Sequence, residues 1–291
     1  MATVNNDFTR ESAPAKSLRT AVLLVFLLYF ATPALWVFFA ITKDPSQIFT
    51  TSGLWFAQPL HFFENVSELF SQQGGIYARW FGNSIIYATT ISAVSTMICA
   101  AGAYAFAKYD FWGRKALFSF ILGTIMVPNT ALVLPLFLLM NKLGLIDTYW
   151  GVILPGLVNP FGLYLMRVFW DTGFPTDLLE AARLDGASEL RIFWSVGLPL
   201  MATGLVTVAL LSFVGAWNNF FLPLIVLNRE NLFPLTLGMN VWNTLIHSGG
   251  GKPIYNLVAL GSLISVLPLL AAFIFLGRYW QGGITAGATK G

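Results

Sequence analysis

Eight of the chain's 29 lysine, arginine, aspartate and glutamate residues gather between positions 167 and 191. They are Arg167, Asp171, Asp177, Glu180, Arg183, Asp185, Glu189 and Arg191. Charged side chains of both signs at this density can bind a protein partner and set its register, or they can form an ordinary solvated helix face. The sequence around the cluster decides between these two interpretations.

Residues that could carry out catalysis are sparse. The only two histidines, His61 and His247, lie far apart, so they cannot form an HExxH metal pair, and no GxSxG motif occurs. The single cysteine, Cys99, excludes an intramolecular disulfide and a cysteine metal site. The run 249–253 (GGGKP) lacks the first glycine of a phosphate-binding loop and the hydroxyl residue after its lysine. We therefore predict no catalytic residues, no metal site and no nucleotide hydrolysis in this chain.

The composition places the chain in a lipid bilayer. Hydrophobic residues make up 56% of it and charged residues 10%, against about 25% charged in soluble domains. Long windows without charge occur at 20–42, 80–107, 116–141, 149–166, 192–228 and 253–277. Since roughly 20 apolar residues in a helix cross the hydrocarbon core, we predict an all-α membrane protein with six transmembrane helices. The fifth window is too long for one span and predicts a helix followed by an aromatic, re-entrant segment ending at Pro223.

The first apolar window is longer than the core of a cleaved signal peptide, so we predict that it is a retained helix. The domain boundaries follow: an N-terminal tail at 1–17, a transmembrane domain at 18–280 and a C-terminal tail at 281–291. With the N-terminus in the cytoplasm, 11 lysines and arginines fall on the inner side and five on the outer side. Both termini and the charged cluster are therefore predicted to be cytoplasmic, and the net charge of +3 reflects topology rather than nucleic-acid binding.

The windows contain no aspartate, glutamate, lysine or arginine. Intramembrane ionisable residues are typical of proton relays and ion-coupled carriers, so a proton-driven pump is disfavoured. A sodium-coupled carrier, which can use backbone carbonyls and hydroxyls, remains an alternative.

The charged cluster itself predicts a helix, a turn and a second helix at about 172–191. Asp177 and Glu180 have the spacing of a capping box, a short helix should run from Leu178 to about Leu184, and Gly186 suits a left-handed turn. Ser188 can cap the next helix. An apolar surface rimmed by charge is predicted from four residues, which are Leu178, Leu179, Ala181 and Ala182. It could enter a groove of another protein, or lie at the lipid headgroups.

The spacing of Glu180-Ala181-Ala182, three residues, Gly186, nine residues and then Val196-Gly197-Leu198-Pro199 resembles the EAA loop of ABC-importer permeases. Only Val196 departs from the family pattern, which has isoleucine there. The segment 217–223 (WNNFFLP) and the ending 283–291 (GITAGATKG) are similar to the maltose-transporter G-type subunit. The resemblance covers the chain after its N-terminal tail.

This resemblance implies a permease of a bacterial or archaeal plasma membrane. The partners it implies are a second, similar permease, two copies of an ATPase subunit and an extracytoplasmic solute-binding protein. The chain itself then needs no cofactor, because ATP and Mg²⁺ belong to the ATPase subunits, and it is not an enzyme. The residues expected to dock as a coupling helix are Glu180, Ala181, Ala182, Arg183, Asp185 and Gly186.

The cargo implied by the resemblance is a sugar or oligosaccharide. Amides and aromatic rings suit sugars, so Trp217, Asn218, Asn219 and Phe220 are candidates for the solute pathway, although such residues also pack and cap helix ends. The segment 233–253 could contact the binding protein instead. Two alternatives remain: a permease for another solute, such as a polyamine or phosphate, and a membrane scaffold whose loop recruits a cytoplasmic regulator.

Overall fold

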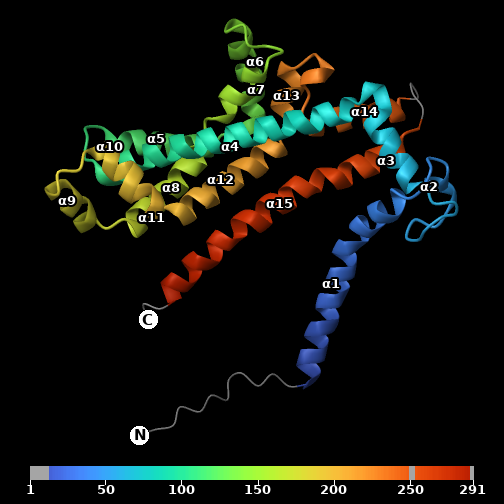
Figure 1. The fold of residues 1–291 in the computed structure, drawn as a ribbon, viewed down its shortest axis with the longest axis horizontal. Helices are drawn as coiled ribbons and strands as arrows, with labels where there is room; N and C mark the ends of the chain where they lie inside the picture. Colours follow the sequence, from blue (N-terminus) through green and yellow to red (C-terminus); the bar gives the residue numbers. More distant parts are fainter. Residues whose placement is uncertain (1–12, 249–252, 289–291) are drawn as a thin grey trace.

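The computed structural model describes residues 13–248 and 253–288, and every regular element in these ranges is a helix (Figure 1). The predicted all-α class is therefore confirmed. Within the segment 233–253, residues 249–252, which form the GGGK run, lie outside the described residues.

Three helices are long and apolar enough to cross a membrane unbroken: α1 (Ala13–Ala40), α4 (Ile76–Lys108) and α15 (Tyr255–Ala288). Three further candidate spans are bent pairs. The first joins α5 (Arg114–Ile125) to the segment Thr130–Lys142, which contains α6 (Val133–Lys142), and bends by 96°. The described residues thus hold three continuous spans, or six if each bent pair is one span.

The second bent pair is α7 (Tyr149–Gly156) with α8 (Pro160–Gly173), at 41°, and the third is Glu189–Leu200 with α12 (Ala202–Trp217), at 79°. Prolines explain where these helices break. Pro128 precedes the short 3₁₀ turn before α6, Pro160 opens α8, and Pro199 lies just before the bend at Met201. Each proline lacks a backbone donor and restrains the residue before it, so the regular helical hydrogen-bond ladder is interrupted near it.

Helix α4 is the centre of the bundle and packs against α8, α12 and α14 (Leu235–His247). Its small residues Ala100 and Ala103 are buried, and Ser92 Oγ donates to the Ala209 carbonyl at 2.6 Å. This agrees with the close approach that small residues permit between membrane helices. One core lies around Trp80 and Trp242, and a second lies around Trp170 at the other end.

Helix α1 stands away from the bundle and meets α15 only near its C-terminal end (Figure 1). No residue of its most apolar stretch is buried. Helix α1 begins at Ala13, within the predicted N-terminal tail, and α15 continues to Ala288, within the predicted C-terminal tail. The remainder of both predicted tails, 1–12 and 289–291, lies outside the described residues.

The connection between α1 and α4 folds over the adjoining end of the bundle and contains α2 (Gln47–Thr50) and α3 (Phe62–Ser71). Asn65 is 3% exposed; its Nδ2 donates to the Ile41 and Lys43 carbonyls, and its Oδ1 accepts from Asn256. The buried Lys43 ammonium donates to the Ser52 carbonyl. The loop is therefore held by buried polar contacts, each of which offsets the cost of removing its groups from water.

Candidate functional site

The EAA segment forms α9 (Thr176–Leu184), directly after Pro175. The predicted capping box is wrong, because the helix starts two residues before Leu178 and no side chain caps it. Pro175 sets this start, which puts Asp177 inside the first turn rather than at the cap. There its carboxylate still interacts favourably with the positive end of the helix dipole.

The predicted turn after α9 is confirmed. Gly186 has φ +78°, its amide bonds to the Arg183 carbonyl at 3.0 Å, and the Ala187 amide bonds to the Ala182 carbonyl at 3.1 Å. This is the Schellman arrangement, in which glycine takes the left-handed position. Ser188 Oγ then accepts the Arg191 amide and caps α10 (Glu189–Arg191), which continues as a π-helix at Ile192–Gly197.

Charged and aromatic side chains brace this turn against the end of α4. Arg183 Nε donates to Glu189 Oε1 at 2.7 Å, and the Tyr109 hydroxyl donates to Glu189 Oε2. The hydrogen bond to Glu189 raises the pKa of the Arg183 guanidinium. Sequence reasoning missed Tyr109, because nothing in a lone tyrosine 80 positions earlier indicates its partner.

The apolar surface of α9 differs from the prediction in two positions. Leu179 is 2% exposed and belongs to the core around Trp170, and Ala182 packs against that core. Leu178 and Ala181 remain exposed, and Leu184, which was not predicted, is 89% exposed. Of the six predicted coupling residues, Ala182 is half-buried, and the exposed ones are Glu180, Ala181, Arg183, Asp185 and Gly186.

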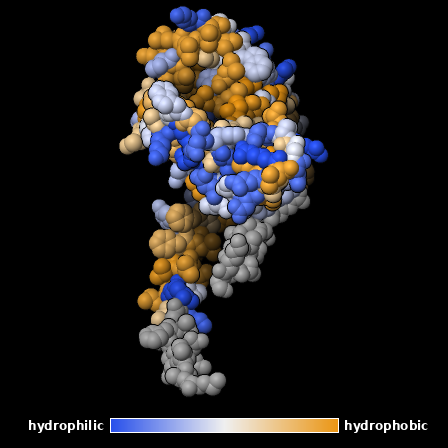
Figure 2. Space-filling view, turned by 90° about the vertical axis from the view of Figure 1, so that its left-hand side faces the viewer, coloured by the Kyte–Doolittle hydropathy of each residue, from blue (hydrophilic) through white to orange (hydrophobic). Residues whose placement is uncertain are grey.

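Gly197 of the Val-Gly-Leu-Pro segment has a packing reason. A Cβ placed there would lie 2.6 Å from the Trp170 ring, and Trp170 Nε1 donates to the Ala100 carbonyl at 3.1 Å. The segment after the turn therefore rests on a tryptophan that is itself fixed to α4. Figure 2 looks onto this end of the molecule and shows hydrophilic residues gathered there, above the hydrophobic surface of α1.

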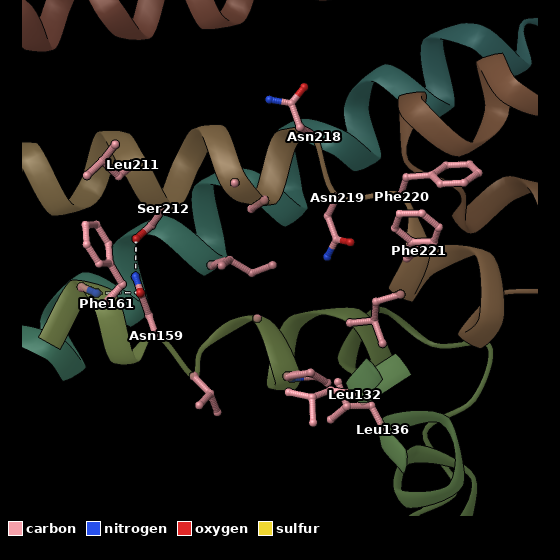
Figure 3. A pocket seen from close by; sticks show the side chains of 18 of the residues that line it. Leu132, Leu136, Asn159, Phe161, Leu211, Ser212, Asn218, Asn219, Phe220 and Phe221 are labelled. Carbon is pink, nitrogen blue, oxygen red and sulfur yellow. Dashed lines mark hydrogen bonds between the residues drawn. The ribbon is translucent and has the colours of Figure 1, made fainter. Parts of the chain in front are cut away.

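A cavity of about 520 Å³ lies farther along the bundle, where the bent spans break (Figure 3). Its wall comes from α8, α12, the segment 130–136 and the segment 215–222. Polar members of the lining are Thr130, Asn159, Ser212, Asn218 and Asn219, and the aromatic members are Phe161, Phe220 and Phe221. None of the described lining residues carries a charge.

Asn159 joins the spans that precede and follow the EAA segment. Its Oδ1 accepts the Gly162 amide at 2.8 Å, which caps α8, and its Nδ2 donates to Ser212 Oγ of α12 at 2.9 Å (Figure 3). Sequence reasoning missed this residue as a site candidate. The signal was present, because an asparagine followed by a proline and an apolar run is typical of a helix start.

The structure separates the four candidates of the segment 217–220. Trp217 is 3% exposed, stacks on Phe213 with ring centroids 5.9 Å apart, and does not line the cavity. Asn218 belongs to the lining, but its side chain points away from the cavity and donates to the Val214 carbonyl (Figure 3). Asn219 points into the cavity, and Phe220 lines it.

Comparisons with known proteins agree with this architecture. The family model described as "Binding-protein-dependent transport system inner membrane component" matches residues 98–285. The chain is 35% identical over 284 residues to the arabinooligosaccharides transport system permease protein AraQ of Halalkalibacterium halodurans, covering 97% of this chain and 99% of that protein. It is 32% identical over 277 residues to the galactooligosaccharides transport system permease protein GanQ of Bacillus subtilis, covering 93% of each.

The fold is also shared with a solved structure. A chain of a bacterial ABC transporter involved in the import of the acidic polysaccharide alginate superposes with a TM-score of 0.79 at 23% sequence identity, covering 93% of this chain and 99% of that one. The family match covers more than half of the sequence, and the described helices supply the spans it requires. The chain therefore belongs to the inner-membrane permease components of binding-protein-dependent ABC transporters, a multi-pass and non-catalytic part of a larger transport complex.

Proposed function

We propose that the chain is one of two permease subunits of an ATP-driven importer for a neutral sugar or oligosaccharide. The observation that carries this proposal is the wall of the 520 Å³ cavity, which combines amides, hydroxyls and aromatic rings without a charged side chain. A cavity of this size is within the range of small-molecule sites.

The polar groups of the wall suit hydroxyl-rich solutes. The side-chain amide of Asn219 makes no hydrogen bond within the described part of the chain, so its two N–H donors and its carbonyl acceptor remain available. Sugar hydroxyls can donate and accept, and their apolar ring faces can pack on Phe161 or Phe220. A polyamine or a phosphate ester would instead leave its charge unpaired in this wall, which is costly.

Two of the relatives support the same solute class. The proteins AraQ and GanQ are named for arabinooligosaccharide and galactooligosaccharide transport, and each aligns over nearly the whole chain. The scaffold alternative has no support from these alignments, because they match the membrane spans as well as the EAA segment.

We further propose the assembly and orientation that such an importer needs. A second permease completes the pathway, two ATPase subunits bind beneath, and a solute-binding protein delivers the cargo from outside. The 11 to five distribution of lysines and arginines supports cytoplasmic termini in a bacterial or archaeal plasma membrane. It also supports a cytoplasmic position for the end that carries α9.

The contacts of α9 with the bundle support the proposed coupling role. The Schellman turn at Gly186 and the contacts of Glu189 with Arg183 and Tyr109 hold α9 to the bundle. Its exposed residues, with Glu180 and Leu184 among them, offer charge and apolar surface to an ATPase groove. A braced helix transmits displacement, and ATP-driven motion would then favour one of two arrangements of the spans.

The test is solute-stimulated ATP hydrolysis by the reconstituted transporter with its binding protein. Neutral pentose and hexose oligosaccharides should stimulate hydrolysis, whereas oligouronates, glycerol phosphate and polyamines should not. Asn219→Ala should raise the apparent KM for the sugar, while Asn228→Ala, which removes an exposed amide outside the cavity, should leave it unchanged. Stimulation by a charged solute alone would contradict the proposal.

A further inference from the structure

A second cavity, of about 510 Å³, lies between the start of α5 and α8. Seven residues line it, which are Asp110, Phe111, Gly113, Arg114, Lys115, Ala116 and Arg167. Three of these seven side chains are cationic and one is anionic. The solute pathway does not use any of them, since the two cavities share no lining residue.

The cations of this pocket keep unused donors. Arg114 Nη1 donates to the Tyr109 carbonyl at 3.0 Å and pairs with Asp110, and Arg167 Nε lies 3.4 Å from Asp171 Oδ2. A guanidinium carries five N–H groups, so each arginine has further donors after these contacts. Lys115 is exposed and makes no ion pair or hydrogen bond with the described residues. The pocket can therefore accept an anion without breaking the pairs already present.

The pocket lies at the border between an apolar span and water. The Arg167 guanidinium stands over the Phe118 ring, 4.0 Å from its centroid, so the charge is held where α5 and α8 pack together. Trp112 is fully exposed and Phe111 is 41% exposed beside it. Exposed aromatic rings next to lysine and arginine at a span end are typical of the headgroup layer of a membrane.

We propose that this pocket binds a phosphate group, and that the phosphate is that of an anionic phospholipid headgroup such as phosphatidylglycerol. Basic pockets between spans on the cytoplasmic side suit such headgroups, because the phosphodiester accepts several hydrogen bonds while the acyl chains stay in the bilayer. The exposed aromatic side chains of Phe111 and Trp112 would lie beside the acyl chains of the lipid. The inference rests on the membrane orientation proposed above, and it is independent of the solute.

The position of the pocket gives it a route to the EAA segment. Arg114 contacts the carbonyl of Tyr109, whose hydroxyl donates to Glu189, and Glu189 accepts from Arg183 of α9. Lys115 stands outside this chain of contacts. It is therefore the residue whose replacement tests lipid binding without loosening the brace of α9.

The experiment counts lipids that remain bound to the intact transporter. The complex of this chain with its partner subunits is reconstituted in nanodiscs that contain equal amounts of phosphatidylglycerol and phosphatidylcholine, released into mild detergent and examined by native mass spectrometry. The parent should retain phosphatidylglycerol in preference to phosphatidylcholine. Lys115→Gln should lower that preference about fivefold, the change expected for one lysine near an anionic headgroup.

The matched control is Lys142→Gln, which removes an exposed lysine from the end of α6 and should leave lipid retention unchanged. Equal retention by the parent and Lys115→Gln, with the complex intact, would overturn the proposal. A further measurement adds excess inorganic phosphate, to distinguish a lipid headgroup from free phosphate as the ligand of the pocket. If free phosphate displaces phosphatidylglycerol from the parent, the pocket binds a soluble anion and the proposal of a lipid ligand is overturned. An absence of sugar-stimulated ATP hydrolysis would contradict the proposed function and not the lipid site, since lipid retention does not depend on the cargo.

Discussion

Asp147 and Arg229 bind each other through both side chain and backbone. Asp147 Oδ2 accepts from Arg229 Nε at 2.6 Å, Oδ1 accepts the Arg229 amide at 2.9 Å, and the Arg229 guanidinium donates to the Asp147 carbonyl at 2.7 Å. This contact fixes the α6–α7 connection to the segment after α13 (Phe221–Val226). The three short helices α6, α7 and α13 consequently form one lobe, visible above the bundle in Figure 1.

We expect Asp147→Asn to loosen this lobe. Loss of the charged acceptor should lower the free energy of unfolding by about 1–2 kcal/mol, a modest value because Arg229 is largely exposed. Thermal unfolding of the detergent-solubilised complex measures it. Asp110→Asn is the control, since it removes a carboxylate paired with an arginine four residues away on an exposed surface, and it should change stability by less than about 0.5 kcal/mol.

The contribution of Asp147 should also depend on pH. Burial alone would raise the pKa of its carboxyl, but hydrogen bonds from the Arg229 and Asn228 amides and from the Arg229 side chain lower the pKa below its usual value. A lowered folded-state pKa means that the stabilisation is complete above the unfolded value of about 3.9 and is lost as the pH falls through the folded value. The stability difference between parent and Asp147→Asn should therefore be constant from about pH 5 to 8 and shrink below about pH 4. A difference that already vanishes at neutral pH would contradict this assignment.

Changes in α9 should uncouple transport without unfolding the chain. Glu180→Lys reverses an exposed charge at the proposed ATPase contact, so insertion should be normal while uptake and recovery of the ATPase subunit fall sharply. Gly186→Pro should do the same, because proline cannot adopt φ +78° and removes the amide that bonds to Arg183.

Two variants serve as controls for the α9 experiment. Glu68→Lys reverses an exposed charge on α3, and Gly123→Ala adds a methyl group where the space is open. Both should transport at the parent rate. Parent-like uptake by Glu180→Lys would remove α9 from the coupling role.

The bond between Asn159 and Ser212 should influence transport more than stability. Ser212→Ala removes the Asn159–Ser212 hydrogen bond and leaves the cap of α8 in place, and we expect an altered apparent KM for the sugar with a loss of stability of about 1 kcal/mol. Asn159→Ala also removes the cap of α8 and should cost about 1 kcal/mol more. Uptake kinetics and thermal unfolding, measured on both variants, distinguish the two roles. Identical kinetics in Ser212→Ala and the parent would show that this contact is purely structural.

Trp217 should behave as a core residue. Its ring stacks on Phe213 and meets Phe81 edge-on, so Trp217→Ala should destabilise the chain by about 3–5 kcal/mol. The sugar preference of the protein that still folds should be unchanged. A shift in preference among several sugars, without loss of stability, would return Trp217 to the solute pathway.

The EAA turn could be predicted in detail because its signals are local. Gly186 and Ser188 have backbone roles that depend on near neighbours, and the structure shows both. The start of α9 was misplaced because Pro175 and the Asp177 box compete within the same few residues, and the fixed proline geometry prevails.

The contacts that complete the site could not be predicted, because they join residues far apart in the sequence. Asn159 and Ser212 are 53 positions apart, and Tyr109 and Glu189 are 80 apart. The same limit applies to Trp217. Its neighbours Asn218 and Asn219 share its polar and aromatic context in the sequence, but only the packing of Phe81 and Phe213 shows which way each side chain faces.

The uncharged wall of the larger cavity has an electrical consequence. Moving one elementary charge across a membrane potential is worth about 2.3 kcal/mol per 100 mV. A neutral solute that passes a wall without ionisable side chains carries no charge through that field, and among the described lining residues none is available to move with it. Uptake of the proposed neutral sugar should therefore be electroneutral. The membrane voltage would neither assist nor oppose accumulation of the sugar. The attainable sugar gradient would then depend on the free energy of ATP hydrolysis alone.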